Sequence, residues 1–309
     1  MRSVQKAAYC WMGMVSMLGG QSLEIKEAWF QERGAAILQE VLSQKWAQDW
    51  KGAKLERVRL VEQKADLTHP TGLPPVWVAD IVGADDQVGM MMWDSRGIGR
   101  LVEFTLDAKL NAPGGISGVP NLQQFPVKDG KGGKIASGCV PTAAASLLAY
   151  WAEKRFPQWR GDDGQKIEDL TLRLRRRLSM SPFPDTDGFT SDGMTLAGAF
   201  PHHLAAAIRN DALEKGVNID CEISRFSIET LKKEIGLSRP VLLSCTVRVP
   251  HKPHLSWGHE VVGVAWATID GVEIVGVVDN FYPTKHAETI RWIRADAFRS
   301  LIAIRPKKE

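Results

Sequence analysis

The sequence predicts an α+β protein in which a buried helix carrying a cysteine packs against an antiparallel sheet, preceded by a small helix-plus-β-meander domain. The stretch from Ile135 to Ala152 carries no charge, which is typical of a helix buried on all sides. Two β-rich runs flank Asp270 and Gly271, a dipeptide that favours a two-residue hairpin turn. Four shorter strand-like runs occupy the first third of the chain.

Composition excludes several classes of protein. The chain has 309 residues, of which 44% are hydrophobic and 24% charged, so it is long enough for one large domain or two modest ones. Disordered, collagen-like and coiled-coil chains have other compositions. The net charge of +3 is too small to indicate nucleic acid or an anionic membrane as a partner.

The amino terminus has the pattern of a secretory signal. Arg2 and Lys6 precede an uncharged run over residues 7–23, and residues 20–22 offer a cleavage site between small residues. We expect residues 1–22 to be a signal peptide and the mature protein to be secreted or periplasmic, without a stable membrane span. A buried first helix is the alternative. Loss of Cys10 would leave an odd number of cysteines, which hints at one free reactive thiol: Cys139, Cys221 and Cys245.

The first predicted domain covers residues 23–115. Apolar residues recur at helical spacing from Leu23 to Trp46. Turn residues then separate four strand-like runs, as in an antiparallel meander: Leu55–Val61, Val76–Val82, Val88–Trp93 and Leu101–Thr105. The segment from Asn111 to Gly115 has the composition of a linker. We therefore place a domain boundary there and assign residues 116–309 to a second domain.

Cys139 marks the start of the uncharged helix. Pro141 suits only the first turn of a helix, so Cys139 lies at the amino-terminal end, where free backbone N–H groups and the helix dipole favour a thiolate. A buried cysteine is more often inert packing, so further residues must converge on it.

Three more helices are expected between this helix and the late hairpin, over residues 167–178, 196–214 and 228–235, followed by a strand over residues 240–247. The apolar stripe of the first of them places four arginines mostly on the solvent side: Arg173, Arg175, Arg176 and Arg177.

The late hairpin carries a histidine and two candidate partners for it. With a two-residue turn at Asp270 and Gly271, counting back along both strands places Asn280 opposite Val261, on the same side of the sheet as His259. Asp279 then faces the other side. Asn280 is therefore the favoured residue to orient the imidazole, although a β-bulge would exchange the two faces and favour Asp279.

Cys139, His259 and Asn280 supply the three groups of a thiol nucleophile site. The thiol needs a base to hold it as thiolate, and the base needs a third group to fix its tautomer. Acyl transfer also needs donors for the developing oxyanion. The backbone N–H of Cys139 and the side-chain amide of Gln124 or Gln123 are the candidates.

These residues together resemble the papain-like cysteine peptidases, nearest to the bacterial C39-like and streptopain-like branches. The resemblance covers the last two-thirds of the chain: Gln124, Gly138-Cys139-Val140-Pro141-Thr142-Ala143 with Tyr150-Trp151, Gly258-His259-Glu260-Val261-Val262, and Asp279-Asn280-Phe281-Tyr282. It implies a papain-like fold and thiol-dependent hydrolysis of peptide bonds in a peptide or protein substrate, with no metal or cofactor.

The resemblance also assigns roles. It makes Cys139 the nucleophile, His259 the general base and acid, Asn280 the orienting residue and Gln124 the oxyanion donor, with Tyr282 shielding the His and Asn pair. Members of the C39-like branch often use an aspartate in the third role, which keeps Asp279 open. In secreted relatives an amino-terminal segment is an inhibitory propeptide, so residues 23–115 would cover the cleft of a zymogen until the linker is cut.

Three other functions remain open. A thiol acyltransferase would use the same three residues, and a non-catalytic peptide-binding module could keep the same fold. A zinc site would draw on four residues whose spacing loosely resembles that of metal ligands: Cys245, His251, His254 and His259. Pro250 and Pro253 break any helix that would align the first two histidines, so we expect no metal.

Overall fold

The computed structural model describes residues 22–61, 75–84, 87–95, 99–109, 115–128, 134–160, 166–178, 181–182, 197–249, 252–280 and 289–307. The expected signal peptide, apart from Ser22, lies outside these ranges, as do residues 111–114 of the linker and Tyr282. Within the described ranges no helix is both long and apolar enough to cross a bilayer.

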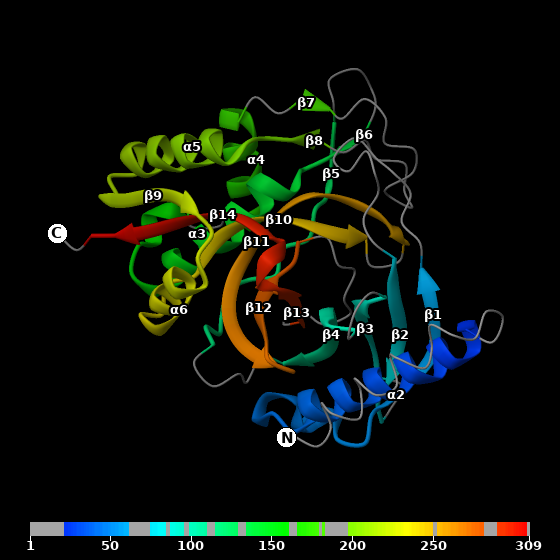
Figure 1. Cartoon of the computed structure of the whole chain (residues 1–309). Helices are drawn as coiled ribbons and strands as arrows, with labels where there is room; N and C mark the ends of the chain where they lie inside the picture. Colours follow the sequence, from blue (N-terminus) through cyan, green and yellow to red (C-terminus); the bar gives the residue numbers. More distant parts are fainter. Residues whose placement is uncertain are drawn as a thin grey trace.

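The fold is mixed α+β and is organised around one large antiparallel sheet (Figure 1). Its ten strands run in the order β1 (Lys54–Val61), β2 (Val76–Val82), β3 (Val88–Asp94), β4 (Leu101–Lys109), β13 (Thr289–Arg294), β12 (Val272–Val278), β11 (Lys252–Ile269), β10 (Val241–Val249), β14 (Phe298–Pro306) and β9 (Ile219–Arg225). Two short hairpins pair β5 (Pro126–Lys128) with β6 (Lys134–Ala136), and β7 (Ser181–Pro182) with β8 (Ala197–Gly198).

The helices form two groups at different ends of the sheet (Figure 1). Helix α2 (Ser22–Leu42) and the 3-10 turn η1 (Lys45–Trp50) pack against the meander. The second group surrounds the later strands: α3 (Cys139–Lys154), η2 (Pro157–Trp159), α4 (Ile167–Leu178), α5 (Pro201–Glu214), α6 (Ile228–Gly236) and η3 (Ala295–Ala297). Helix α3 packs on β10 and β11.

Most expected elements are present. The meander has the four predicted strands, and α3 is buried along nearly its whole length, which confirms the interpretation of the uncharged stretch. The first helix ends at Leu42 rather than Trp46. Helix α5 begins at Pro201 rather than residue 196, because proline is favoured in the first turn and cannot continue an existing helix.

The two predicted domains contribute to the same sheet. Strand β4 from the first pairs with β13 from the second, and aromatic rings stack across this junction. Trp46 lies 4.7 Å from Trp292 and 5.9 Å from Phe104 between ring centroids. The sheet therefore continues across the predicted domain boundary near residue 115. The division into two domains stays a prediction.

Two arginines of α4 depart from expectation. Arg173 pairs with the fully buried carboxylate of Asp211, with 2.7 Å between Nε and Oδ1. Arg175 donates to the backbone carbonyls of Ala136 and Ser137. The prediction that the arginines lie mostly on the solvent side was wrong for these two, because a buried carboxylate and free carbonyls offered them partners.

Candidate active site

Cys139 is the first residue of α3, and Ser137 and Gly138 connect it to the strand β6. Gly138 before it has φ 96° and ψ 143°, a conformation that L side chains rarely adopt and glycine adopts freely. The chain therefore turns sharply into the helix. Cys139 is only partly buried, whereas the residues that follow it are buried, so the thiol lies at the surface end of a core helix.

Several polar contacts fix this turn. Ser137 Oγ accepts from the Phe125 N–H at 3.1 Å, and Thr142 Oγ1 donates to the Gly138 carbonyl at 2.7 Å. Arg175 Nη1 donates to the carbonyls of Ala136 and Ser137 at 3.0 and 2.9 Å. Sequence reasoning missed these supporting residues, and only the placement of hydroxyl residues around Cys139 could have suggested two of them.

The His259 hairpin contains a β-bulge. Asp270 and Gly271 form the expected turn, with φ values of 54° and 70°, and the predicted pairing holds from Ile269 opposite Val272 to Ala265 opposite Gly276. The register then shifts by one residue at Val264. The Val264 carbonyl accepts from the Ile116 N–H at 2.8 Å, so a distant segment binds the bulge.

The bulge brings Asp279, rather than Asn280, to the histidine. Beyond Val264 the pairing places Val262 opposite Val278, so that Asp279 follows on the side of the sheet that carries His259. His259 Nε2 lies 2.7 Å from Asp279 Oδ1, and both side chains are 2% exposed. The favoured assignment of Asn280 as the residue against the imidazole is therefore corrected to its alternative.

The other side of the imidazole faces the thiol. Asn280 Nδ2 donates to the carbonyls of both Cys139 and Glu260, so the two segments meet, and the Cys139 thiol is close enough to act on the pKa of His259. Because Asp279 occupies Nε2, Nδ1 is the ring nitrogen left for the thiol. Burial alone would lower the pKa of His259, but the charge and hydrogen bond of Asp279 and those of Cys139 outweigh it and raise the pKa to about 10. The site therefore favours an imidazolium at neutral pH.

Asn280 joins three segments of the site. Its Nδ2 donates to the Cys139 carbonyl at 3.0 Å and to the Glu260 carbonyl at 2.9 Å. Its Oδ1 accepts from Gln124 Nε2 at 3.0 Å. Gln123 Nε2 instead donates to the Asp279 carbonyl at 3.2 Å. Both predicted glutamines thus lie at the site, and Gln124 is the one bonded to the residue that contacts Cys139.

A buried arginine binds the far side of Asp279. Arg291 Nη1 lies 2.6 Å from Asp279 Oδ2, and its other nitrogens contact the carboxylate of Glu103. Burial would raise the pKa of Asp279, yet the charges and hydrogen bonds of His259 and Arg291 hold it well below its usual range. Sequence reasoning missed Arg291 and Glu103, because each shares its strand with other charged residues and nothing local distinguishes it.

Two further buried groups that can ionise lie next to His259, the carboxyl of Glu260 on the same strand and the thiol of Cys245 on the neighbouring strand. Glu260 Oε2 accepts from Ser244 Oγ at 2.5 Å, and burial raises the pKa of Glu260 to about 7. Cys245 pairs with His259 across β10 and β11, and burial raises the pKa of its thiol well above the usual value. Cys139, Cys221 and Cys245 are all free thiols.

The alternative zinc ligands are only partly described. His251 lies outside the described residues, and in the described part of the chain no three His, Cys, Asp or Glu side chains are grouped to hold a metal ion.

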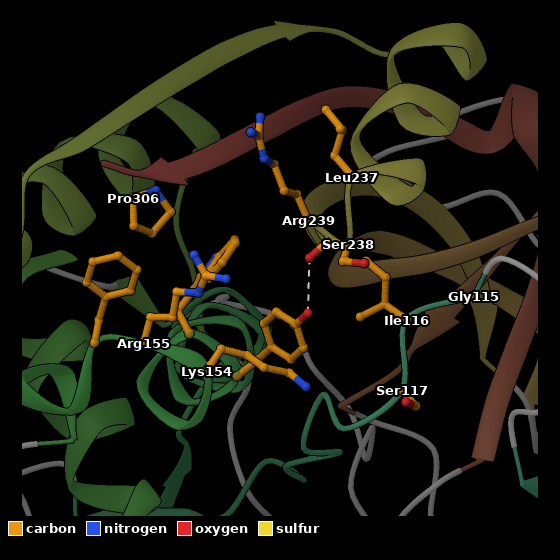
Figure 2. Close-up of a pocket in the computed structure, with 12 residues that line it drawn as sticks. Gly115, Ile116, Ser117, Lys154, Arg155, Leu237, Ser238, Arg239 and Pro306 are labelled. Atoms are coloured by element: carbon orange, nitrogen blue, oxygen red, sulfur yellow. Dashed lines mark hydrogen bonds between the residues drawn. The ribbon is translucent and has the colours of Figure 1, made fainter. Parts of the chain in front are cut away.

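A cavity of about 430 Å³ lies at the other end of α3 (Figure 2). Tyr150, Lys154 and Arg155 line it, and Tyr150 donates to the Ser238 carbonyl at 3.0 Å. At 1.5 Å per residue, Tyr150 lies roughly 16 Å along the helix from Cys139. The cavity is therefore separate from the thiol.

No family model matches the chain, and no curated protein matches it significantly.

Proposed function

We propose that this protein is a cysteine peptidase of papain-like fold that cleaves peptide bonds through an acyl-enzyme on Cys139. The observation that carries the proposal is the pair of His259 Nε2 and Asp279 Oδ1, 2.7 Å apart, on a strand that Asn280 ties to the backbone of Cys139. A nucleophile, a base and an orienting group are the parts that such chemistry needs. The choice of a peptide substrate rests on the family resemblance.

In the proposed reaction His259 already holds the thiol proton as an imidazolium, and the thiolate sulfur of Cys139 attacks the carbonyl carbon of the scissile bond. In this proposal the backbone N–H of Cys139 and the side-chain amide of Gln124 donate to the oxyanion. His259 returns its proton to the leaving amine, which leaves a thioester. Water then attacks the thioester while His259 accepts its proton, and the thiolate of Cys139 is regenerated as the acid product departs.

The test is cleavage of an unstructured protein such as casein by the full chain. We expect peptide products with the wild type and none with Cys139→Ala, while Cys221→Ser, a change at a buried thiol remote from His259, leaves cleavage intact. Cleavage that persists in Cys139→Ala would overturn the proposal. If an added amine appears in the products in place of water, the acyltransferase interpretation replaces hydrolysis.

A further inference from the structure

Glu103 reaches the candidate site from the amino-terminal half of the chain. In the pairing of β4 with β13 (Figure 1), Thr105 lies opposite Arg291 and Glu103 lies opposite Ile293. Glu103 and Arg291 are therefore diagonal neighbours on one face of the sheet. Both side chains are 2% exposed, so neither charge is solvated and each depends on the other.

Arg291 bridges two carboxylates. Its Nη2 lies 3.0 and 2.8 Å from the two oxygens of Glu103, and its Nε lies 3.2 Å from Oε1. Its Nη1 lies 2.6 Å from Asp279 Oδ2, while Asp279 Oδ1 faces His259. Glu103 thus fixes the guanidinium plane, the guanidinium fixes the carboxylate of Asp279, and that carboxylate fixes the imidazole.

Other contacts join the same two parts of the chain at the hairpin that carries His259. In α2, Glu40 Oε1 accepts from the backbone N–H of Asp270 at 2.7 Å, and Arg33 forms an ion pair with the Asp270 carboxylate. The amino-terminal segment therefore holds the hairpin turn as well as the far side of Asp279.

We propose that Glu103 and Arg291 are positioning residues for the His259–Asp279 pair, and that the meander β1 to β4 is a permanent part of the active protein rather than a removable propeptide. The inference rests on the proposed function. Removal of β4 would deprive Arg291 of Glu103, one of the two carboxylates that bind it, which is unfavourable. It would also expose the edge of β13 and one face of the Trp46–Phe104–Trp292 stack.

The first test removes the charge of Glu103 in the full chain. Glu103→Gln keeps the shape of the side chain, and its matched control is Glu234→Gln. Glu234 is also buried and pairs with Arg305 and Arg239, but it lies on α6. The readouts are the NMR titration of the His259 ring and the rate at which iodoacetamide alkylates Cys139 at pH 7, with adducts mapped by mass spectrometry.

We expect Glu103→Gln to lower the titration midpoint of His259 by about 0.5 to 1 pH unit, because Arg291, no longer shared with Glu103, would draw more of the charge of Asp279 away from the imidazolium. Alkylation of Cys139 should also be slower in Glu103→Gln. The control Glu234→Gln should change neither the His259 midpoint nor the alkylation rate. In an Asp279→Asn background the effect of Glu103→Gln should vanish, because Glu103 acts only through Asp279. An unchanged titration and alkylation rate in Glu103→Gln would overturn the positioning role.

The second test does not depend on a folded Glu103 variant. Residues 111–114 are replaced by the recognition sequence of a specific protease, and the full chain is then cut. We expect the two pieces to co-elute on gel filtration with unchanged alkylation of Cys139. Release of the amino-terminal piece, with Cys139 in the remainder alkylated as fast or faster, would overturn the permanent role of the meander.

The proposed function and the positioning role of Glu103 can fail separately. If Cys139 reacts no faster in the wild type than in His259→Gln, the proposed function fails. If Cys139 reactivity depends on His259 but not on Glu103, only the present inference fails.

Discussion

His259 Nε2 and Asp279 Oδ1 lie 2.7 Å apart between two side chains that are each 2% exposed. In this dry environment the carboxylate stabilises an imidazolium and fixes which ring nitrogen faces the thiol. Asn280, the neighbour of Asp279, contacts backbone carbonyls and Gln124. The roles of these adjacent residues are therefore separable by substitution.

Asp279→Asn should reduce kcat/KM for peptide cleavage by about 10² to 10⁴, because an amide can hold the ring in the wrong tautomer and cannot stabilise its positive charge. Asn280→Ala removes neutral hydrogen bonds and should cost about tenfold. Steady-state kinetics of both variants provides the check. A larger loss in Asn280→Ala than in Asp279→Asn would contradict the assignment of Asp279 as the orienting residue.

The charge of His259 should persist well above neutral pH. Its pKa in the folded protein is about 10, against about 6.5 in an unfolded chain. The stabilisation from the imidazolium is therefore fully present below about pH 6.5 and is lost as the pH rises through 10. NMR titration of the ring, assigned with His259→Gln, should show proton loss near pH 10, and a midpoint near 6.5 would count against the ion pair.

Glu260 should make stability fall with pH in a different window. Its folded pKa of about 7 lies above the ordinary value of 4.5, so the unfolded chain ionises first and the free energy of unfolding falls between about pH 4.5 and 7. Glu260→Gln should remove this fall, which is on the order of 1 to 3 kcal/mol.

Urea denaturation of wild type and Glu260→Gln at pH 4.5 and pH 8 measures the difference. The control is Glu273→Gln, which breaks a part-exposed ion pair with Lys232 and should change stability by less than about 1 kcal/mol. An equal pH dependence in wild type and Glu260→Gln would show that Glu260 ionises normally.

Gly138→Ala tests the turn that presents the thiol. Alanine at φ 96° is strained by about 1 to 3 kcal/mol, and relief of that strain would move Cys139. We expect lower stability and slower alkylation of Cys139. Gly216→Ala, at φ 66° beyond α5, is the matched control and should lower stability alone. Equal alkylation rates in the two variants would show that the turn at Gly138 does not determine the position of the Cys139 thiol.

Local patterns in the sequence predict much of this arrangement. The uncharged stretch gives the buried helix, Pro141 gives its first turn and hence the place of Cys139, and Asp270 with Gly271 gives the hairpin. Each of these depends on residues close together in the chain. The expected pairing is correct over the five residue pairs nearest the turn.

The remaining parts depend on contacts between distant segments. The bulge at Val264 is bound by Ile116; Gly263 beside it is compatible with a bulge but does not by itself fix the register. Pairing of β4 with β13 brings Glu103 to Arg291 across 188 residues, and no local rule specifies that strand order. This is why counting along the hairpin favours Asn280, whereas the folded chain presents Asp279.

The central claim is that the thiol of Cys139 is activated by His259. The most direct measurement treats the full chain with a papain-directed epoxide and maps the adduct by mass spectrometry. We predict one adduct, on Cys139, whose formation slows at least about 100-fold in His259→Gln. Preferential labelling of Cys221 or Cys245, or an equal rate of Cys139 labelling in His259→Gln, would contradict the account.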